Sequence, residues 1–531
     1  MFFKMLTIKN ITCFAKIKHA FYTGLNDKIN NFRSLKWCEM LKVKMVLVGL
    51  CIAHGIAISQ TTVNDNPIDG KEMMSTVKYL SSERFKGRMS CTVEYEQASR
   101  YVATRFKNAG LKPLIGNTML QEFDDEVNYI LDARVYLIDN NNRPIHPMQL
   151  GEDFVCRGYS GSGEVRGEVV FVGFGIKTDE YNDYRSIDVR NKIVAVFKST
   201  PPWKPQSGSW GDVTPRGKAR IARELGAKAI IFIGEPHITP NTMIYGSVAC
   251  GAKPHLADFP MIHACNRFVD SLFSQLPYKP FEYFEMIKRD KAPHSIETGK
   301  SVYIKISAEY HEAKKTYNVV GYIEGSDLKL KNEYVILGAH LDHVGYQGDK
   351  LYFPGANDNA SGVAGLIAIA EAIKKSPTKP RRSIVFVAFS SEESGLKGSK
   401  YFVNNMPFPA EQTVAMLNFD CIGQGDSIAI GGRLSYPKLW KKTQKLDRKN
   451  TKLLSHKTFG GGGADAQAFH EIGIPTLYFN TSGGYKFLHQ TTDKPETLNP
   501  IVFEKGVHLG YLTTMQLANG KYKREKDKQK K

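Results

Sequence analysis

Cysteine is scarce in this sequence, and its spacing is irregular. The 531 residues contain eight cysteines, and the five that follow Gln60 are Cys91, Cys156, Cys250, Cys265 and Cys421. No two of these form the C-x-x-C pair of a structural zinc site or a thioredoxin-like redox centre. Cys250 and Cys265 could pair in an oxidising compartment, and two buried free thiols are the alternative. The cysteines therefore define neither a metal site nor a disulfide framework.

Several common catalytic signatures are also missing. No G-x-S-x-G sequence stands at a strand-to-helix turn, so a serine hydrolase of that type would lack its nucleophile. The GKS at residues 299–301 ends like a phosphate-binding loop, but the glycine required five residues before it is His294. The four glycines at 460–463 are not followed by Lys and Ser/Thr, and the His-Glu pair at 470–471 lacks the second histidine of a helical zinc motif.

Positive charge is abundant but concentrated at the two ends. The net charge is +19, yet residues 1–59 hold nine Lys/Arg against two acids and residues 521–531 hold seven against two. Only +7 remains for the long middle. We therefore expect no nucleic-acid partner, and we interpret residues 521–531 as a basic, disordered and solvated tail.

The beginning of the chain has the pattern of an export signal. From Met40 a basic segment, an apolar core over residues 45–56 and the small residues Ala57 and Ser59 lead to a cleavage site before Gln60. The apolar core is too short to span a bilayer comfortably. We predict a signal peptide over residues 40–59, an upstream extension over 1–39, export to the periplasm or the extracellular space, and no stable membrane anchor.

Metal-type ligands gather between Tyr334 and Gly362. A short apolar run with strand character stops just before His340, and Asp358 stands in a Gly- and Asn-rich loop directly before a predicted helix. If the backbone stays extended, Asp342 leaves on the same side as His340 and can accept the hydrogen of the second imidazole nitrogen.

The same construction recurs three times downstream. Predicted strands at 383–389, 414–419 and 474–479 precede Glu392 with Glu393, Asp420, and His489, respectively. Because open α/β sheets collect ligands beyond the carboxyl ends of their strands, these side chains can converge. Adjacent residues on extended backbone point to opposite sides, so the two glutamates can divide ligation and base catalysis between them. We interpret His343 as structural.

The charges of this set suit two divalent cations. Two neutral histidines with Asp358, Glu393 and Asp420 ionised carry three negative charges against four positive ones, and a hydroxide makes the site neutral. One carboxylate between two His/carboxylate pairs can bridge metals about 3.5–4 Å apart, as in two-metal hydrolytic sites.

These motifs together resemble metallopeptidase family 28, the co-catalytic zinc peptidases that include aminopeptidases and glutamate carboxypeptidases. The resemblance rests on five motifs in family order: HLD at 340–342, GANDNASG at 355–362, EESGLKGS at 392–399, NFD at 418–420 and LHQTTDKPE at 488–496. It implies two zinc ions, one held by His340 and Asp420 and the other by Glu393 and His489, with Asp358 bridging them.

The resemblance also implies other roles. Glu392 would be the general base, and Asp342 the partner of His340. Many relatives carry a tyrosine before the last ligand histidine, where this chain has Leu488. Tyr485 could substitute for it in holding the reaction intermediate. Asp465 either lines the substrate pocket or caps the next helix.

The predicted fold is a three-layer α/β/α zinc-exopeptidase sandwich with a mixed, mostly parallel twisted sheet. The catalytic domain would comprise residues 60–144 and 299–520. Residues 145–298 resemble a protease-associated domain, a β-rich module inserted in some family members, which either shapes the cleft or only packs against it.

The expected activity is hydrolysis of amino-terminal residues from peptide substrates by a dizinc aminopeptidase. A carboxypeptidase or dipeptidase on the same scaffold is an alternative, with Arg433 as the candidate for binding the substrate carboxylate. A single-zinc glutaminyl cyclase and a non-enzymatic receptor-like relative are further alternatives, although the chain keeps all five ligand positions.

Overall fold

The fold is described from a computed structural model, which covers residues 66–234, 244–251, 254–520 and 522–529. The predicted signal peptide and upstream extension lie outside these ranges. None of the helices in the described part of the chain combines the length and the apolar content needed to cross a membrane. All five cysteines after Gln60 are free thiols, so Cys250 and Cys265 do not pair.

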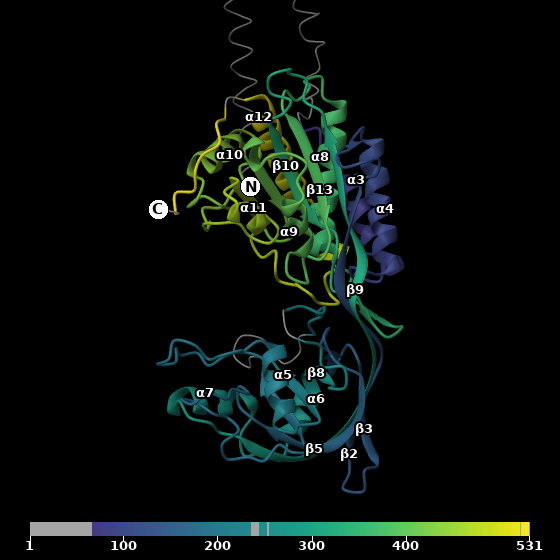
Figure 1. The fold of residues 1–531 in the computed structure, drawn as a ribbon, viewed down its shortest axis with the longest axis vertical. Coiled ribbons are helices and arrows are strands. Elements are labelled where there is room, and N and C mark those ends of the chain that lie inside the picture. The colour runs from purple at the N-terminus through teal and green to yellow at the C-terminus, as the bar shows by residue number, and fades with distance from the viewer. Residues whose placement is uncertain (1–65, 235–243, 252–253, 521, 530–531) are drawn as a thin grey trace, which may run out of the picture. The chain divides into compact units, whose positions relative to one another are not determined.

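A mixed sheet positions the candidate site (Figure 1). The strand order at its centre is β15-β16-β14-β10-β13-β9. Strand β10 pairs in parallel with β13 and β14, and β14 in parallel with β16, whereas β15 and β9 are antiparallel to their neighbours. This confirms the predicted sheet. The bounds are β9 Ile296–Ile323, β10 Tyr334–His340, β13 Ser383–Phe389, β14 Thr413–Phe419, β15 Ile428–Gly431 and β16 Thr476–Thr481.

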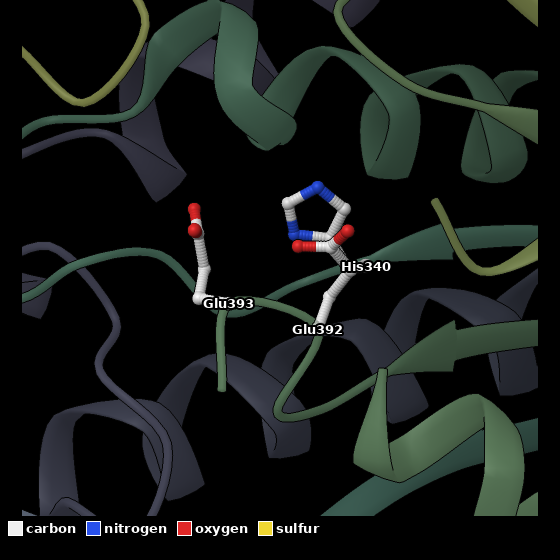
Figure 2. A group of neighbouring side chains, drawn as sticks. All are labelled: His340, Glu392 and Glu393. Carbon is white, nitrogen blue, oxygen red and sulfur yellow. The ribbon is translucent and has the colours of Figure 1, made fainter. Parts of the chain in front are cut away.

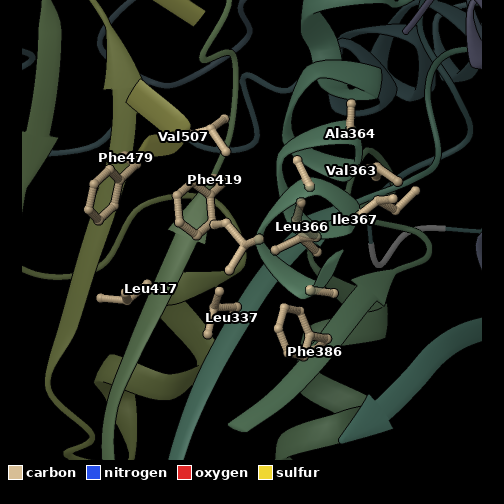
Figure 3. Packing of buried hydrophobic residues seen from close by; sticks show 14 of the residues in the cluster. Leu337, Val363, Ala364, Leu366, Ile367, Phe386, Leu417, Phe419, Phe479 and Val507 are labelled. Carbon is tan, nitrogen blue, oxygen red and sulfur yellow. The ribbon is translucent and has the colours of Figure 1, made fainter. Parts of the chain in front are cut away.

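Helices cover both faces of this sheet. Strand β13 is buried throughout because alternate residues face two different cores. Ile384 and Phe386 belong to the core that includes residues of α3, α4, α8, α10 and α12, whereas Val385 and Val387 belong to the core that includes residues of α9 and α11. Figure 3 shows the first core between α8 and strands β10, β13, β14 and β16. The helices are α3 Gly70–Leu80, α4 Val93–Asn108, α8 Gly362–Lys375, α9 Lys397–Asn404, α10 Pro437–Lys449, α11 Ala466–Glu471 and α12 Pro500–Asn519.

Residues 145–298 add strands to the same sheet. Strand β5 pairs with the first half of β9, and β6, β7, β8 and β4 follow in order. Strand β9 is a single strand of 28 residues. It pairs along most of its length with β2, Leu120–Ile138. The remaining elements are β3 Pro144–Met148, β4 Phe154–Cys156, β5 Gly163–Phe171, β6 Ile193–Phe197, β7 Ala229–Ile233, β8 Met261–Ala264, α5 Pro215–Glu224, α6 Asn266–Leu272 and α7 Pro280–Asp290.

Short elements complete the connections between these helices and strands. They are η1 Glu83–Phe85, β1 Lys112–Pro113, β11 Tyr346–Gln347, β12 Leu351–Tyr352, η2 Ala356–Ser361, η3 Ala410–Gln412 and η4 Pro495–Thr497.

The prediction of a solvated, disordered tail is wrong for residues 522–529. Tyr522 is buried, and the Glu525 carboxylate accepts hydrogen bonds from the backbone N–H of Lys438 and Leu439 at the start of α10. Arg524 donates to the carbonyl oxygen of Gly473 at 2.7 Å. Because Glu525 and Arg524 pair with helix-end and loop backbone groups, the segment is held against the fold while its lysines remain exposed.

Candidate metal centre

The carboxyl ends of the parallel strands bring the predicted ligands together. Residue pairing places His340 opposite Phe389 at the end of β13, and Gly338 opposite Asn418 near the end of β14. The turns that follow β13 and β14 therefore begin beside His340, and they carry Glu392, Glu393 and Asp420.

One cluster forms around His340. Its Nε2 lies 3.3 Å from Oδ1 of Asp358 and 3.3 Å from Oδ1 of Asp420. All three side chains are buried. One nitrogen and two carboxylate oxygens so close together form a donor set suited to zinc or another divalent transition metal.

A second cluster forms around His489 and shares Asp358 with the first. His489 Nε2 lies 2.8 Å from Oε2 of Glu393 and 3.4 Å from Oδ2 of Asp358. Asp358 thus presents one oxygen to each histidine. Its Oδ2 is buried and accepts no well-formed hydrogen bond from any described residue. A buried anionic oxygen without a donor is costly, so this carboxylate fits a bridging position between two cations.

His343 lies in the second cluster, although it was interpreted as structural. Its Nδ1 is 3.1 Å from Oε1 of Glu393 and 3.4 Å from Oδ2 of Asp358, and the ring is fully buried. A second histidine three residues after His340 was the available signal. His343 and His489 thus both approach the same pair of carboxylates.

The two adjacent glutamates do not lie on extended backbone. Strand β13 ends at Phe389, and Ser391 has a left-handed backbone conformation, so Glu392 and Glu393 occupy a turn. Figure 2 shows both carboxylates on the same side of this turn, with that of Glu392 beside the His340 ring. The glutamates therefore separate toward the two clusters, but not by the strand alternation that was expected.

Asp342 contacts His340 differently from the prediction. The shortest contact of His340 Nδ1 is 3.1 Å to the backbone carbonyl oxygen of Asp342, whereas the carboxylate is 3.8 Å away. Strand β10 ends at His340, so the extended geometry on which the prediction depended stops there. The carboxylate instead accepts the backbone N–H of Glu392 at 3.1 Å and of Glu393 at 3.2 Å, and it orders the turn that carries them.

Burial and mutual charge shift the pKa values of the cluster. Burial opposes the charged form of His340 and His489, but the surrounding carboxylates outweigh it and raise both pKa values well above 6.5. Burial, together with neighbouring carboxylates, raises the pKa of Glu392 well above its ordinary value despite His340. For Glu393, burial acts upward, but His489 and His343 outweigh it and lower the pKa to about 2. Glu392 is thus the better proton acceptor of the pair.

A second set of buried groups holds the loop that carries Asp358. Asp493 accepts the backbone N–H of Asn357 and Asp358 at 3.0 Å. The guanidinium of Arg88 is fully buried and donates to the carbonyl oxygens of Leu341, Leu80, Pro354 and Gly355 at 2.8–2.9 Å. The sequence interpretation assigned no role to either residue.

A polar network joins Asp420 to a cavity. Tyr478 donates its hydroxyl to Oδ2 of Asp420 at 2.6 Å, and the hydroxyl of Tyr485 lies 2.5 Å from that of Tyr478. Asn480 donates to the Tyr485 hydroxyl at 2.6 Å. These three side chains line a cavity of about 320 Å³ that also includes the exposed aromatic ring of Phe459.

Two further side chains do not take the roles that the sequence predicted for them. Asp465 is fully buried, so it does not line an open pocket, and its carboxylate does not cap α11. Burial chiefly raises its pKa to about 7, and His340 acts in the opposite direction. Arg433 is exposed and packs over the Trp440 ring at 4.9 Å. Its guanidinium is thus engaged on the surface.

Residues 318–507, which include every candidate ligand, match the sequence profile of Peptidase family M28. This part of the chain is therefore similar to the peptidases of that family. The chain is 22% identical over 443 residues to an aminopeptidase of Bacillus subtilis strain 168, "Aminopeptidase YwaD", covering 80% of this chain and 79% of the relative. It is 25% identical over 418 residues to a "Glutamate carboxypeptidase 2 homolog" of Caenorhabditis briggsae, covering 64% of this chain.

The chain covers a smaller share of the glutamate carboxypeptidase relative than of the aminopeptidase relative. The chain spans about half of the Caenorhabditis briggsae relative, 52% of its length. Among solved structures, an aminopeptidase from Aneurinibacillus sp. strain AM-1 aligns with a TM-score of 0.60 at 20% identity, covering 87% of this chain and 97% of that one. A zinc aminopeptidase from Bacillus subtilis aligns with a TM-score of 0.57 at 18% identity, covering 86% and 98%. Over most of its length the chain therefore has the fold of these aminopeptidase structures.

Proposed function

We propose that this protein is a dizinc aminopeptidase that removes residues from the amino termini of peptides. His340 and Asp420 would hold one zinc, Glu393 and His489 the other, and Asp358 both. The observation that carries the proposal is Asp358, which directs one carboxylate oxygen toward each histidine and has a buried oxygen that accepts no well-formed hydrogen bond from the described residues. Bound zinc polarises a scissile carbonyl and lowers the pKa of water toward neutrality.

Glu392 acts as the general base in this proposal. Its carboxylate stands beside His340, and its raised pKa makes it able to accept a proton from the attacking water. It then passes that proton to the leaving amine, since a single residue can serve as base and acid in succession. Asp342 supports this role by accepting the backbone N–H of Glu392 and so fixing the turn.

Tyr485 is the proposed contact to the reaction intermediate. Leu488 has no hydroxyl to offer at the position before His489. The Tyr485 hydroxyl is held by Tyr478 and Asn480 within one network that reaches Asp420, while the ring lines the 320 Å³ cavity. This cavity would receive the side chain of the residue to be removed.

An aminopeptidase is favoured over a carboxypeptidase by the surroundings of the site. Arg433, the predicted cationic partner of a substrate carboxylate, instead packs over the Trp440 ring at the surface. The relatives covered along most of their length are named aminopeptidases. The predicted signal peptide would direct the enzyme to the periplasm or the extracellular space, where peptides are its substrates.

The test is a comparison of wild type with Glu392→Gln. The variant should bind two zinc ions per chain and lose about 10²–10⁴-fold in kcat on aminoacyl chromogenic substrates. Carboxyl-terminal chromogenic substrates, assayed in parallel with and without a chelator, test the carboxypeptidase alternative. A wild type that contains one zinc would favour a glutaminyl cyclase. Near-normal turnover by the variant would refute the mechanism.

A further inference from the structure

A segment of the inserted region reaches the candidate metal centre. The backbone N–H of Gly246 donates to the carbonyl oxygen of His489 at 2.8 Å. Gly246 lies between β7 and β8, which belong to residues 145–298, whereas His489 belongs to the loop after β16. A candidate metal ligand is thus fixed through its own backbone by a part of the chain that carries none of the proposed zinc ligands.

The backbone of His489 needs such support. Its φ is +54°, in the left-handed region that residues other than glycine seldom occupy. Conformations of this kind persist only where the surrounding structure holds them. The side chain is also the least enclosed of the five proposed ligands, because 29% of it is exposed, compared with 2% for His340. The hydrogen bond from Gly246 therefore supports the least enclosed of the five proposed ligands.

The segment is anchored tightly enough to act as a support. Ile244 and Val248 are buried in a cluster with Val344 and Phe353, which follow His343 along the chain. Ser247 accepts the backbone N–H of Gly158 at 3.0 Å. A Cβ atom on Gly246 would lie 2.5 Å from Cγ2 of Val344 and 3.1 Å from the ring of Phe353. The position thus requires glycine because two side chains approach its backbone closely.

We propose that residues 244–248 are a positioning element of the metal centre. The hydrogen bond from Gly246 to the carbonyl group of His489 sets the orientation of the His489 ring. The zinc ion on the Glu393 side therefore binds fully only when this segment is docked. The inference rests on the proposed function, because it assumes that His489 is a zinc ligand. It gives the inserted region a role beyond packing.

The main test measures zinc affinity in Gly246→Ala. The added methyl group should displace the segment from Val344. The zinc ion on the Glu393 side, which we expect to be the more weakly bound of the two, should then bind about 10–100-fold less tightly, the usual cost of losing an outer support of a metal ligand. Competition with a chelating dye gives this value without an activity assay. Gly234→Ala is the matched control in the same region, because its Cβ would meet only His263, at 3.8 Å.

A rescue variant separates positioning from general damage. Val344→Ala removes the atom that the new methyl group would meet first. The double variant Gly246→Ala/Val344→Ala should therefore bind zinc almost as tightly as Val344→Ala alone. Wild-type zinc affinity in Gly246→Ala, or a double variant as weak as Gly246→Ala, would overturn the proposal.

Hydrogen exchange provides a second measurement on the unmodified protein. Zinc loading should slow exchange of the Gly246 amide by about tenfold or more, because its acceptor becomes fixed, while the Gly234 amide stays unchanged. Equal exchange of Gly246 with and without zinc would overturn the proposal. A wild type that binds no zinc would instead refute the proposed function, so the two failures can be distinguished.

Discussion

The two halves of the candidate metal centre are built in different ways. The His340 half stands at the end of a strand that is paired on both sides, and its side chains are almost completely buried. The His489 half depends on a loop with a left-handed histidine, whose side chain is 29% exposed and whose carbonyl group is held from another region. The comparison teaches that one half is fixed by the sheet, whereas the other is assembled from loops.

Removing the carboxylate that the halves share should have the largest effect. We expect Asp358→Ala to lose both zinc ions and at least about 10³-fold of its activity, because the two-metal chemistry supplies several kcal/mol of barrier lowering. Metal analysis and steady-state kinetics on an aminoacyl substrate measure this. Asp349→Ala, an exposed aspartate in the same connection, is the control. Retention of two zinc ions by Asp358→Ala would show that the halves are independent.

Substituting the histidines one at a time should separate the halves. In a chelator titration we expect His489→Ala to lose the weakly bound zinc and to keep the other, and His340→Ala to lose the tightly bound one. Each loss should be about tenfold to 100-fold or more in affinity. His343→Ala decides which imidazole serves Glu393, because both approach the Glu393 carboxylate and Oδ2 of Asp358. If His343→Ala loses the weak zinc and His489→Ala does not, the proposed assignment of His489 is wrong.

The sequence predicted the His340 half better than its surroundings. Strands β10, β13 and β14 were found from short apolar runs, and their ends necessarily meet because the strands are parallel. The same reasoning brought His489 to the site, because β16 lies beside β14. What failed was local geometry beyond the last paired residue, where Asp342, Glu392 and Glu393 were assumed to lie on extended backbone.

Contacts between distant segments were the other limit. Arg88 donates to backbone carbonyl groups more than 250 residues away, and carbonyl acceptors leave no pattern in the side chains. The tail was misjudged for a similar reason: Glu525 pairs with backbone N–H groups, so composition alone suggested a solvated segment. His343 was set aside because the ligand set was already complete without it.

The pH dependence of stability should differ between metal-free and zinc-loaded protein. In the metal-free form burial acts to lower the pKa of His340 and His489, but the surrounding carboxylates outweigh burial and raise both pKa values. This stabilisation is fully present below about pH 6.5 and is lost as pH rises through the raised values. Zinc-bound imidazoles carry no such proton. The Tm advantage of the zinc-loaded form should therefore widen by about 2 °C or more from pH 6.5 upward.

The two halves should share this pH effect. The metal-free His489→Ala variant should keep the part of the pH-dependent stabilisation that comes from His340. Differential scanning calorimetry across pH 6 to 9 measures it. A constant Tm difference in wild type would show that the imidazoles are not held as cations between the carboxylates.

The smallest effect should come from removing residues 523–531. Lys528 donates its backbone N–H to Ser435, whose hydroxyl accepts the N–H of Gly461, close to the Phe459 ring that lines the cavity. Losing these bonds should raise KM about fivefold, equivalent to about 1 kcal/mol, and leave zinc affinity in both halves unchanged. Lys526→Ala in the full chain is the control. A loss of zinc would mean that the tail supports the metal centre itself.

The reach of Arg88 has a consequence for biosynthesis. Its guanidinium joins the end of α3 at Leu80 to the carbonyl groups of Pro354 and Gly355 just before Asp358, and Asp493 completes that loop. During translation, the contacts that hold the Asp358 loop can therefore be complete only after Asp493 has left the ribosome. A partly synthesised polypeptide that ends before residue 489 would carry His340, Asp358 and Asp420 but not His489, so the second cluster forms last.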